Sequence, residues 1–81
     1  MNGGAMATIV KHRKVNIVFL DADEPIAVHC RPGDIAIVVS DEGWWTSFVG
    51  RDGAIERYDV PYTSYNAALW AAKAAAEYGT L

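Results

Sequence analysis

The chain has 81 residues, with seven lysines and arginines against ten acids, which is enough for one domain with a formal charge of −3. Its only cysteine, Cys30, excludes an intramolecular disulfide, and it forms no metal-ligand spacing with the two histidines, so we expect no cofactor and no metal. No apolar run approaches the roughly 18 residues that span a bilayer, and a lone thiol fits a reducing compartment, which predicts a cytoplasmic protein without membrane contact.

The first six residues are expected to lie outside the folded unit. Their sequence, Met-Asn-Gly-Gly-Ala-Met, lacks the charged and apolar segments of a signal peptide, and Met6 is an alternative start. We predict that residues 1–6 are a disordered N-terminus or a leftover of cloning. Residues 7–81 are then predicted to form a single α+β domain.

The first half of the chain predicts strands separated by polar turns. Residues 7–12 and 15–20 are rich in β-branched side chains and predict two strands, or one long strand bent at residues 13–14. A polar loop follows over residues 21–25. Residues 26–30 alternate in polarity, and Arg31-Pro32-Gly33-Asp34 is typical of a type II turn with Gly33 at positive φ. Residues 26–40 therefore predict a hairpin.

The second half predicts a meander and then a helix. Turn residues at 41–43 and 50–53 separate predicted strands over 44–49 and 54–60. The alanine-rich segment that follows predicts a helix, which begins at Thr63 or Ser64 as the cap and ends at Tyr78. The predicted fold class is α+β: an antiparallel meander of five or six short strands, as a twisted sheet or small open barrel, with one C-terminal helix packed on one face.

The predicted helix has two apolar stripes. The stripe expected to face the sheet is made of Tyr65, Ala68, Leu69, Ala72 and Ala76. The second stripe is made of Ala67, Trp70, Ala71, Ala74 and Tyr78. An ordinary surface helix has a single apolar stripe. The second one reflects either the helix propensity of alanine or a contact of Trp70 and Tyr78 with a partner, and a homodimer through this helix is one such contact.

Two groups of residues are candidates for binding a partner protein. Trp44 and Trp45 are neighbours in a predicted strand and must point to opposite faces, so both are structural or one is an exposed aromatic anchor. Tyr58 and Tyr62 could extend the aromatic patch. The acidic residues lie at predicted turns, as solvated turns or as part of an acidic docking surface: Asp21, Asp23, Glu24, Asp41 and Glu42.

Catalytic chemistry finds no support in the sequence. His29 and Cys30 are neighbours in a predicted strand and cannot share a hydrogen bond, and Cys30 is expected to be buried and inert. The acidic run at residues 21–24 lacks the glycine and the glutamate of a calcium-binding loop. The glycines lie singly in turns, so no phosphate-binding loop exists. We predict no catalytic residue and no enzyme activity.

The basic residues predict an alternative that is weaker than protein binding. Lys11, Arg13 and Lys14 form the only basic run, and contacts to phosphate would make the chain an accessory protein that binds nucleic acid. The rest of the chain carries a net charge of −6, because the total is −3 and this run contributes +3. That balance makes nucleic acid an unlikely partner.

The order of short strands followed by an alanine-rich helix resembles that of small proteins encoded by bacteriophages and mobile elements. The matching features are Arg31-Pro32-Gly33-Asp34 before an apolar strand, and residues 52–78. Some proteins of that kind inhibit host defence and others resemble antitoxins, and the resemblance assigns no functional residue. The sequence therefore predicts a small acidic, non-enzymatic module that binds another protein, in the form of a phage or mobile-element inhibitor of a host protein.

Overall fold

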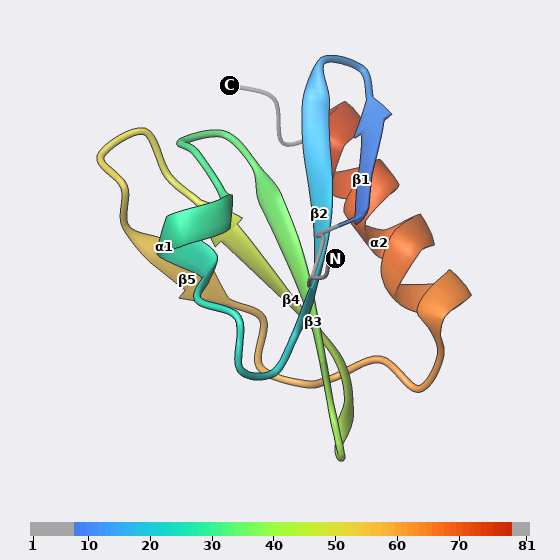
Figure 1. Cartoon of the computed structure of the whole chain (residues 1–81). Helices are drawn as coiled ribbons and strands as arrows, with labels where there is room; N and C mark the ends of the chain where they lie inside the picture. The colour runs from blue at the N-terminus through green and yellow to red at the C-terminus, as the bar shows by residue number, and fades with distance from the viewer. Residues whose placement is uncertain (1–7, 79–81) are drawn as a thin grey trace.

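The fold is a five-stranded sheet with a long C-terminal helix on one face, as the computed structural model shows (Figure 1). The structure describes residues 8–78. The strands are β1 (Thr8–His12), β2 (Val15–Asp21), β3 (Ile35–Ser40), β4 (Gly43–Val49) and β5 (Ile55–Arg57), and the helices are α1 (Ile26–His29) and α2 (Tyr65–Tyr78). This architecture confirms the predicted α+β class, with an open sheet rather than a closed barrel.

The sheet follows the chain order β1-β2-β3-β4-β5, but one of its four pairs is parallel. β1–β2, β3–β4 and β4–β5 are antiparallel, and the turns predicted at residues 41–43 and 50–53 connect the last three strands. β2 and β3 run parallel, with Ile17 opposite Ile35 and Asp21 opposite Val39. The chain between these two strands must therefore cross from one end of the sheet to the other.

The hairpin predicted for residues 26–40 is wrong. Residues 26–29 form α1, a single helical turn that follows Pro25, and the Cys30 N–H donates to the Ile26 carbonyl oxygen at 2.9 Å. The alternation that favoured a strand did not mark a buried face, because the Val28 side chain is 73% exposed. Short apolar runs fit a strand and a buried helical turn equally well, and here the parallel pairing of β2 and β3 requires a crossover.

Adjacent residues on the central strands pack into two separate clusters, one on each face of the sheet. The helix-side cluster lies under α2 and consists of Ile17, Ile35, Ile37, Ala68, Ala72 and Ala76. The crossover-side cluster lies on the face of α1 and consists of Val18, Leu20, Cys30, Ala36 and Val49. The predicted central strand 35–39 is apolar on both faces because both faces are covered there.

Helix α2 buries the three alanines of the stripe that was predicted to face the sheet, whereas Leu69 is half-buried and Tyr65 is 42% exposed. Ala68, Ala72 and Ala76 are at most 1% exposed, and small alanine side chains let the helix lie close to the strands. The Ser64 side-chain oxygen accepts the Ala67 N–H at 3.1 Å, so Ser64 is the cap. At the N-terminal end the Tyr65 ring stacks on Phe19, with ring centres 4.7 Å apart.

Backbone conformation at the turns agrees with the turn residues. Gly33 has φ +94°, as predicted, and the Asp34 N–H donates to the Arg31 carbonyl oxygen at 2.9 Å. This turn leads from the crossover into β3 rather than joining a hairpin. Arg13 and Lys14 both have positive φ, which is the conformation of a two-residue hairpin turn. Residues 8–21 are therefore two strands and not one bent strand.

Candidate binding surface at the acidic end of the sheet

Parallel pairing of β2 and β3 brings the two predicted acidic turns to one end of the sheet. The segment after β2 carries Asp21, Asp23 and Glu24, and the turn after β3 carries Asp41 and Glu42. Residues 58–62 run beside the start of β4 and add Asp59. This acidic end (residues 21–25, 40–43 and 58–64) holds six carboxylates and no lysine or arginine. The hairpin predicted over 26–40 would also have placed these two turns at one end, so this feature does not depend on the crossover.

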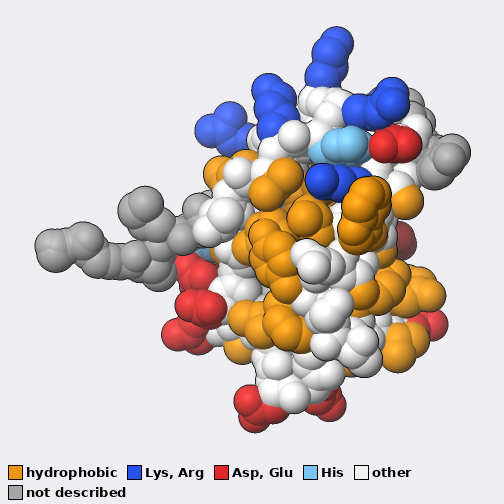
Figure 2. Space-filling model, turned by 90° about the vertical axis from the view of Figure 1, so that its right-hand side faces the viewer, with side chains coloured by type: hydrophobic (Ala, Val, Ile, Leu, Met, Phe, Trp, Pro, Cys, Tyr) orange, Lys and Arg blue, Asp and Glu red, His pale blue; other side chains and the backbone are white. Residues whose placement is uncertain are grey.

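The opposite end of the sheet carries the basic residues. This basic end comprises the β1–β2 turn and the loops before β3 and after β4, with Lys11, Arg13, Lys14, Arg31 and Arg51. It also holds three acids, Asp34, Asp52 and Glu77, so five positive and three negative charges leave +2 against −6 at the acidic end. Figure 2 shows lysine and arginine side chains gathered at the top of the α2 face and acidic side chains along its lower edge. The net charge of −3 therefore hides a separation of charge along the strands.

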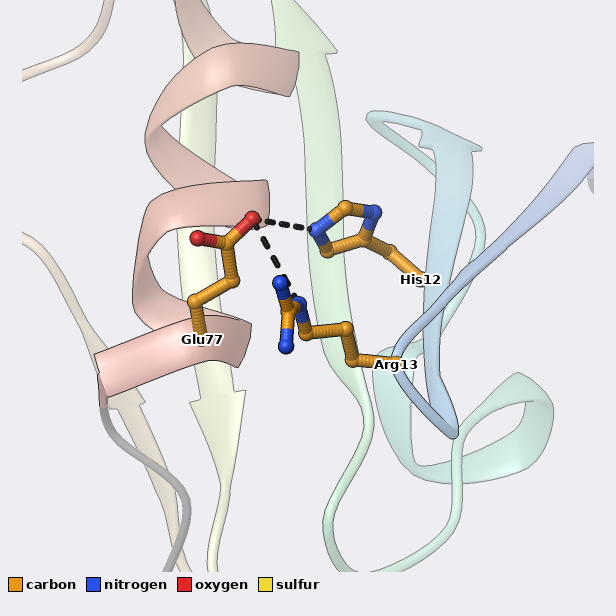
Figure 3. A network of polar contacts seen from close by, with 3 residues as sticks. All are labelled: His12, Arg13 and Glu77. Atoms are coloured by element: carbon orange, nitrogen blue, oxygen red, sulfur yellow. Dashed lines mark hydrogen bonds and ion pairs between the residues drawn. The ribbon is translucent and has the colours of Figure 1, made fainter.

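Glu77, near the C-terminus of α2, is bound by two basic groups at the basic end (Figure 3). Its Oε2 lies 2.8 Å from His12 Nε2 and 3.7 Å from Arg13 Nε. The hydrogen bond from His12 has the largest effect and holds the pKa of the Glu77 carboxyl below its ordinary value; burial opposes this effect, and the Arg13 and His12 charges add to it. These contacts join the last turn of α2 to the β1–β2 turn.

A hollow of about 280 Å³ lies on the crossover side of the sheet, between the two acidic turns. Its lining includes Ala22, Ile26, Val38, Glu42, Trp45 and Arg57. It exists because α1 is only one turn long and leaves the part of this face over β4 and β5 uncovered. We call it the Trp45 hollow, after its largest side chain.

The indole of Trp45 is held in place from two sides. Its Nε1–H donates to the Ser40 Oγ at 3.0 Å, and the same hydroxyl accepts the Glu42 N–H at 3.2 Å. The Arg57 guanidinium lies over the ring, 4.1 Å from its centre, which is a cation–π contact. Ser40 was not predicted as a site residue. The sequence around Ser40 did not indicate a site residue, because its hydrogen bond to Trp45 forms only when β3 pairs with β4.

Trp44 lies on the other face of the sheet, as the alternation in a strand requires. It is half-buried beside the helix-side cluster, and its backbone pairs with Tyr62. The Tyr58 and Tyr62 rings stack 5.9 Å apart on this side. The sheet therefore divides the predicted aromatic patch: Trp45 belongs to the hollow, whereas Trp44, Tyr58 and Tyr62 do not.

A second hollow of about 220 Å³ lies on the α2 side at the acidic end. Its lining includes Thr8, Phe19, Asp21, Glu24, Trp44 and Tyr65. Glu24 accepts the Asp21 N–H through Oε1 at 2.8 Å, and its buried Oε2 lies 3.9 Å from His29 Nε2. Phe19 and Tyr65 were not predicted as site residues, because their periodicity marks them only as core positions.

The remaining predicted residues lie away from these hollows. Trp70 is on the outward face of α2 and is 70% exposed, with Lys73 Nζ 5.6 Å from the ring centre. The side chain of Tyr78 lies outside the described part of the structure. No group of three potential metal ligands comes together within residues 8–78.

Cys30 is buried, as predicted, but for a different reason. It ends the crossover and packs in the crossover-side cluster, rather than facing inward from a strand. Burial, and then the nearby Asp34 charge, raises the pKa of the thiol to about 11. A thiol with that pKa is almost entirely protonated at neutral pH and is a poor nucleophile. Slow reaction with thiol reagents stays a prediction.

Comparison with known proteins adds no family. No protein-family model matches this chain, and no curated protein or solved structure matches it either. No helix in the described residues combines the length and the hydrophobicity needed to cross a membrane. Inference about function therefore starts from the two hollows, the charge separation and the outward face of α2.

Proposed function

We propose that this chain is a non-enzymatic protein-binding module that uses the Trp45 hollow to bind a basic surface of another protein. The observation that carries the proposal is the position of an oriented, half-buried tryptophan between two acidic turns, with Arg57 over its ring as the one basic residue of the hollow. Tryptophan is among the residues most enriched at the energetic centre of protein interfaces. Acidic residues around it would attract a basic partner and speed its association.

The geometry supports a side chain from the partner entering the hollow. Ser40 fixes the edge of the Trp45 indole, so little side-chain entropy remains to be lost on binding. Arg57 covers one face of the ring from an exposed three-residue strand, β5. A partner that supplies its own arginine or lysine would compete with Arg57 for that ring and would be attracted by Glu42 in the lining and by the acidic turns beyond it. An inhibitor that occludes a basic surface of a host protein is the form of this function that fits the resemblance to phage and mobile-element proteins.

Binding of nucleic acid is the second candidate, and one observation favours it. The fold adds Arg31 and Arg51 to the end of the sheet that already carries Lys11, Arg13 and Lys14. Phosphate contacts at this end would make retention on DNA fall steeply with salt. This candidate would be supported against the first if the double variant Lys11→Gln with Lys14→Gln lost retention on DNA while Trp45→Ala kept it.

The test compares capture of proteins by variants that differ only in the hollow. Immobilised wild type, Trp45→Ala and the double variant Asp41→Asn with Glu42→Gln are each incubated with lysate, and bound proteins are quantified. The matched control is Ile9→Ala, which removes an exposed apolar side chain from β1, away from the hollow. We expect that at least one protein is captured equally by wild type and the control, and that neither hollow variant captures it.

A purified captured protein then allows direct titration. Trp45→Ala should weaken its affinity by about tenfold or more, which corresponds to loss of a central interface residue. The double acidic variant should reduce the association rate more than it raises the dissociation rate, and added salt should reproduce its effect on wild type. Equal affinity of wild type and Trp45→Ala for every captured protein would refute the proposal.

A further inference from the structure

The outward face of α2 has an apolar centre that no other part of residues 8–78 covers. Trp70 is 70% exposed and Ala74 is exposed, Ala67 and Ala71 beside them are half-buried, and the exposed Asn66 and Glu77 bound the apolar centre at either end. In Figure 2 the hydrophobic side chains form a band across the middle of this face. Exposed tryptophan beside small side chains on one helix is the composition of a packing surface rather than of a solvated one.

Charge is separated along the axis of this helix. At its C-terminal end, Glu77 contacts Arg13 of the basic end, and Lys14 is the next residue of the same turn. At its N-terminal end, Tyr65 lines the same hollow as Asp21 and Glu24 of the acidic end. The apolar face of α2 therefore lies between a basic region and an acidic region. This arrangement suits a partner that presents an acidic region to the basic one and a basic region to the acidic one.

We propose that the partner for this face is a second copy of the chain, packed with the two α2 helices antiparallel about a twofold axis. An antiparallel arrangement places the basic end of each copy against the acidic end of the other, and twofold symmetry makes this contact twice. A parallel arrangement would place like charges together. The charge separation thus fits a second copy in the antiparallel direction and disfavours the parallel one.

The positions of the residues fit such an axis. If it passes α2 at the level of Ala72, residue 70 of one helix lies opposite residue 74 of the other, so that each Trp70 packs on the partner's Ala74. Small side chains at 67, 71 and 74 permit a close approach of two helices. A 14-residue helix is only about 21 Å long, so its apolar face is smaller than a standard interface of about 800 Å² per partner. The charged ends therefore have to contribute contact area.

This interface is independent of the proposed function, because the Trp45 hollow lies on the other face of the sheet. The dimer would leave the Trp45 hollow of each copy open, and the two Trp45 hollows would lie on opposite sides of the assembly. Failure of one proposal leaves the other standing.

The first experiment measures mass in solution by light scattering coupled to size exclusion, and by sedimentation equilibrium, in low salt. Wild type should be a dimer, and Trp70→Glu should be a monomer at the same concentration. Val28→Glu is the matched control, because Val28 is equally exposed but lies on α1, on the other face, and it should stay dimeric. A monomeric wild type up to millimolar concentration, or a dimeric Trp70→Glu, overturns the proposal.

The second experiment tests the direction of packing by charge reversal. One variant carries Arg13→Glu and Lys14→Glu, and the other carries Asp21→Lys and Asp23→Lys; circular dichroism checks that both are folded. Each variant alone should be largely monomeric, and an equimolar mixture should form a one-to-one heterodimer. The direction is tested by a variant with all four substitutions, in which the two charged ends are exchanged: it should dimerise with itself and not with wild type, whereas a parallel arrangement would pair it with wild type. Added salt should weaken the wild-type dimer. A mixture that stays monomeric, or a heterodimer of the fourfold variant with wild type, overturns the antiparallel arrangement.

Discussion

The two faces of the sheet differ in how much of them is covered, although the same strands supply both. On one face, α2 runs for 14 residues and buries three alanines against Ile17, Ile35 and Ile37. On the other face, α1 is a single turn without a fully buried residue, and the crossover-side cluster is completed by Cys30 just after it. The helix-covered face is therefore closed along α2 and opens at the acidic end in the second hollow, whereas the crossover face leaves the Trp45 hollow.

Because of this difference, we expect one face of the sheet to contribute mainly to stability and the other mainly to binding. Residues on the helix-covered face of the central strands lie deep in a packed layer, where changes in volume cost free energy of unfolding. Residues around the Trp45 hollow lie at the edge of the smaller cluster and are half-buried, so they can change their contacts at lower cost. Substitutions on the helix-covered face should act mainly on stability, and those in the hollow mainly on binding.

The largest expected effect compares two adjacent residues of β3. Ile37→Ala removes a side chain that is 1% exposed under α2 and should lower the free energy of unfolding by about 2–5 kcal/mol. Val38→Ala, on the crossover face, removes a half-buried side chain that lines the hollow and should cost less than half of that. Urea denaturation followed by circular dichroism measures both. Equal losses would show that the two faces are equally packed.

A smaller effect is expected at Gly43, where the chain enters β4. Gly43 has φ +132°, and a Cβ there would clash with the Tyr62 carbonyl oxygen. That oxygen accepts the Trp44 N–H at 2.9 Å, which ties residues 58–62 to the start of β4. Gly43→Ala should therefore cost about 2 kcal/mol or more, through backbone strain and displacement of this segment. Thermal and urea denaturation test it, and an unchanged midpoint would contradict the close approach.

Gly33, in the turn on the crossover side, should show backbone strain without a clash. Its φ is +94°, but a Cβ would meet nothing within 4 Å. Gly33→Val should therefore cost on the order of 1 kcal/mol or more, because a β-branched residue disfavours positive φ. Gly33→Asn is the control and should cost less, because asparagine tolerates this conformation. A melting temperature of the valine variant equal to that of wild type would refute the turn assignment.

The smallest effect concerns the ion pairs that join α2 to the β1–β2 turn. The pKa of Glu77 is lowered in the folded state, so the carboxylate contributes stability above its ordinary pKa of 4.5. That contribution is lost as the pH falls below this value and through the folded pKa. Glu77→Gln should be slightly less stable than wild type at pH 7, with the difference vanishing toward pH 3. Urea midpoints across this range measure it, and a difference independent of pH would argue against the His12 and Arg13 contacts.

Local order in the chain was determined largely by the sequence itself. Alanine content and the Ser64 cap specified α2, and the turn residues at 41–43 and 50–53 specified the meander from β3 to β5. Strand alternation was enough to place Trp44 and Trp45 on opposite faces, and the spacing in α2 was enough to separate its buried stripe from Trp70. These features depend on neighbouring residues, whose conformational preferences act at short range.

The tertiary structure decided how these pieces are assembled. Residues 26–29 fit a strand or a helical turn, and only the parallel pairing of β2 with β3 made them a crossover. That pairing also leaves only the short α1 over the crossover face, where the Trp45 hollow lies. It depends on contacts between residues far apart in the chain, which cover both faces of β3, and no local pattern encodes them.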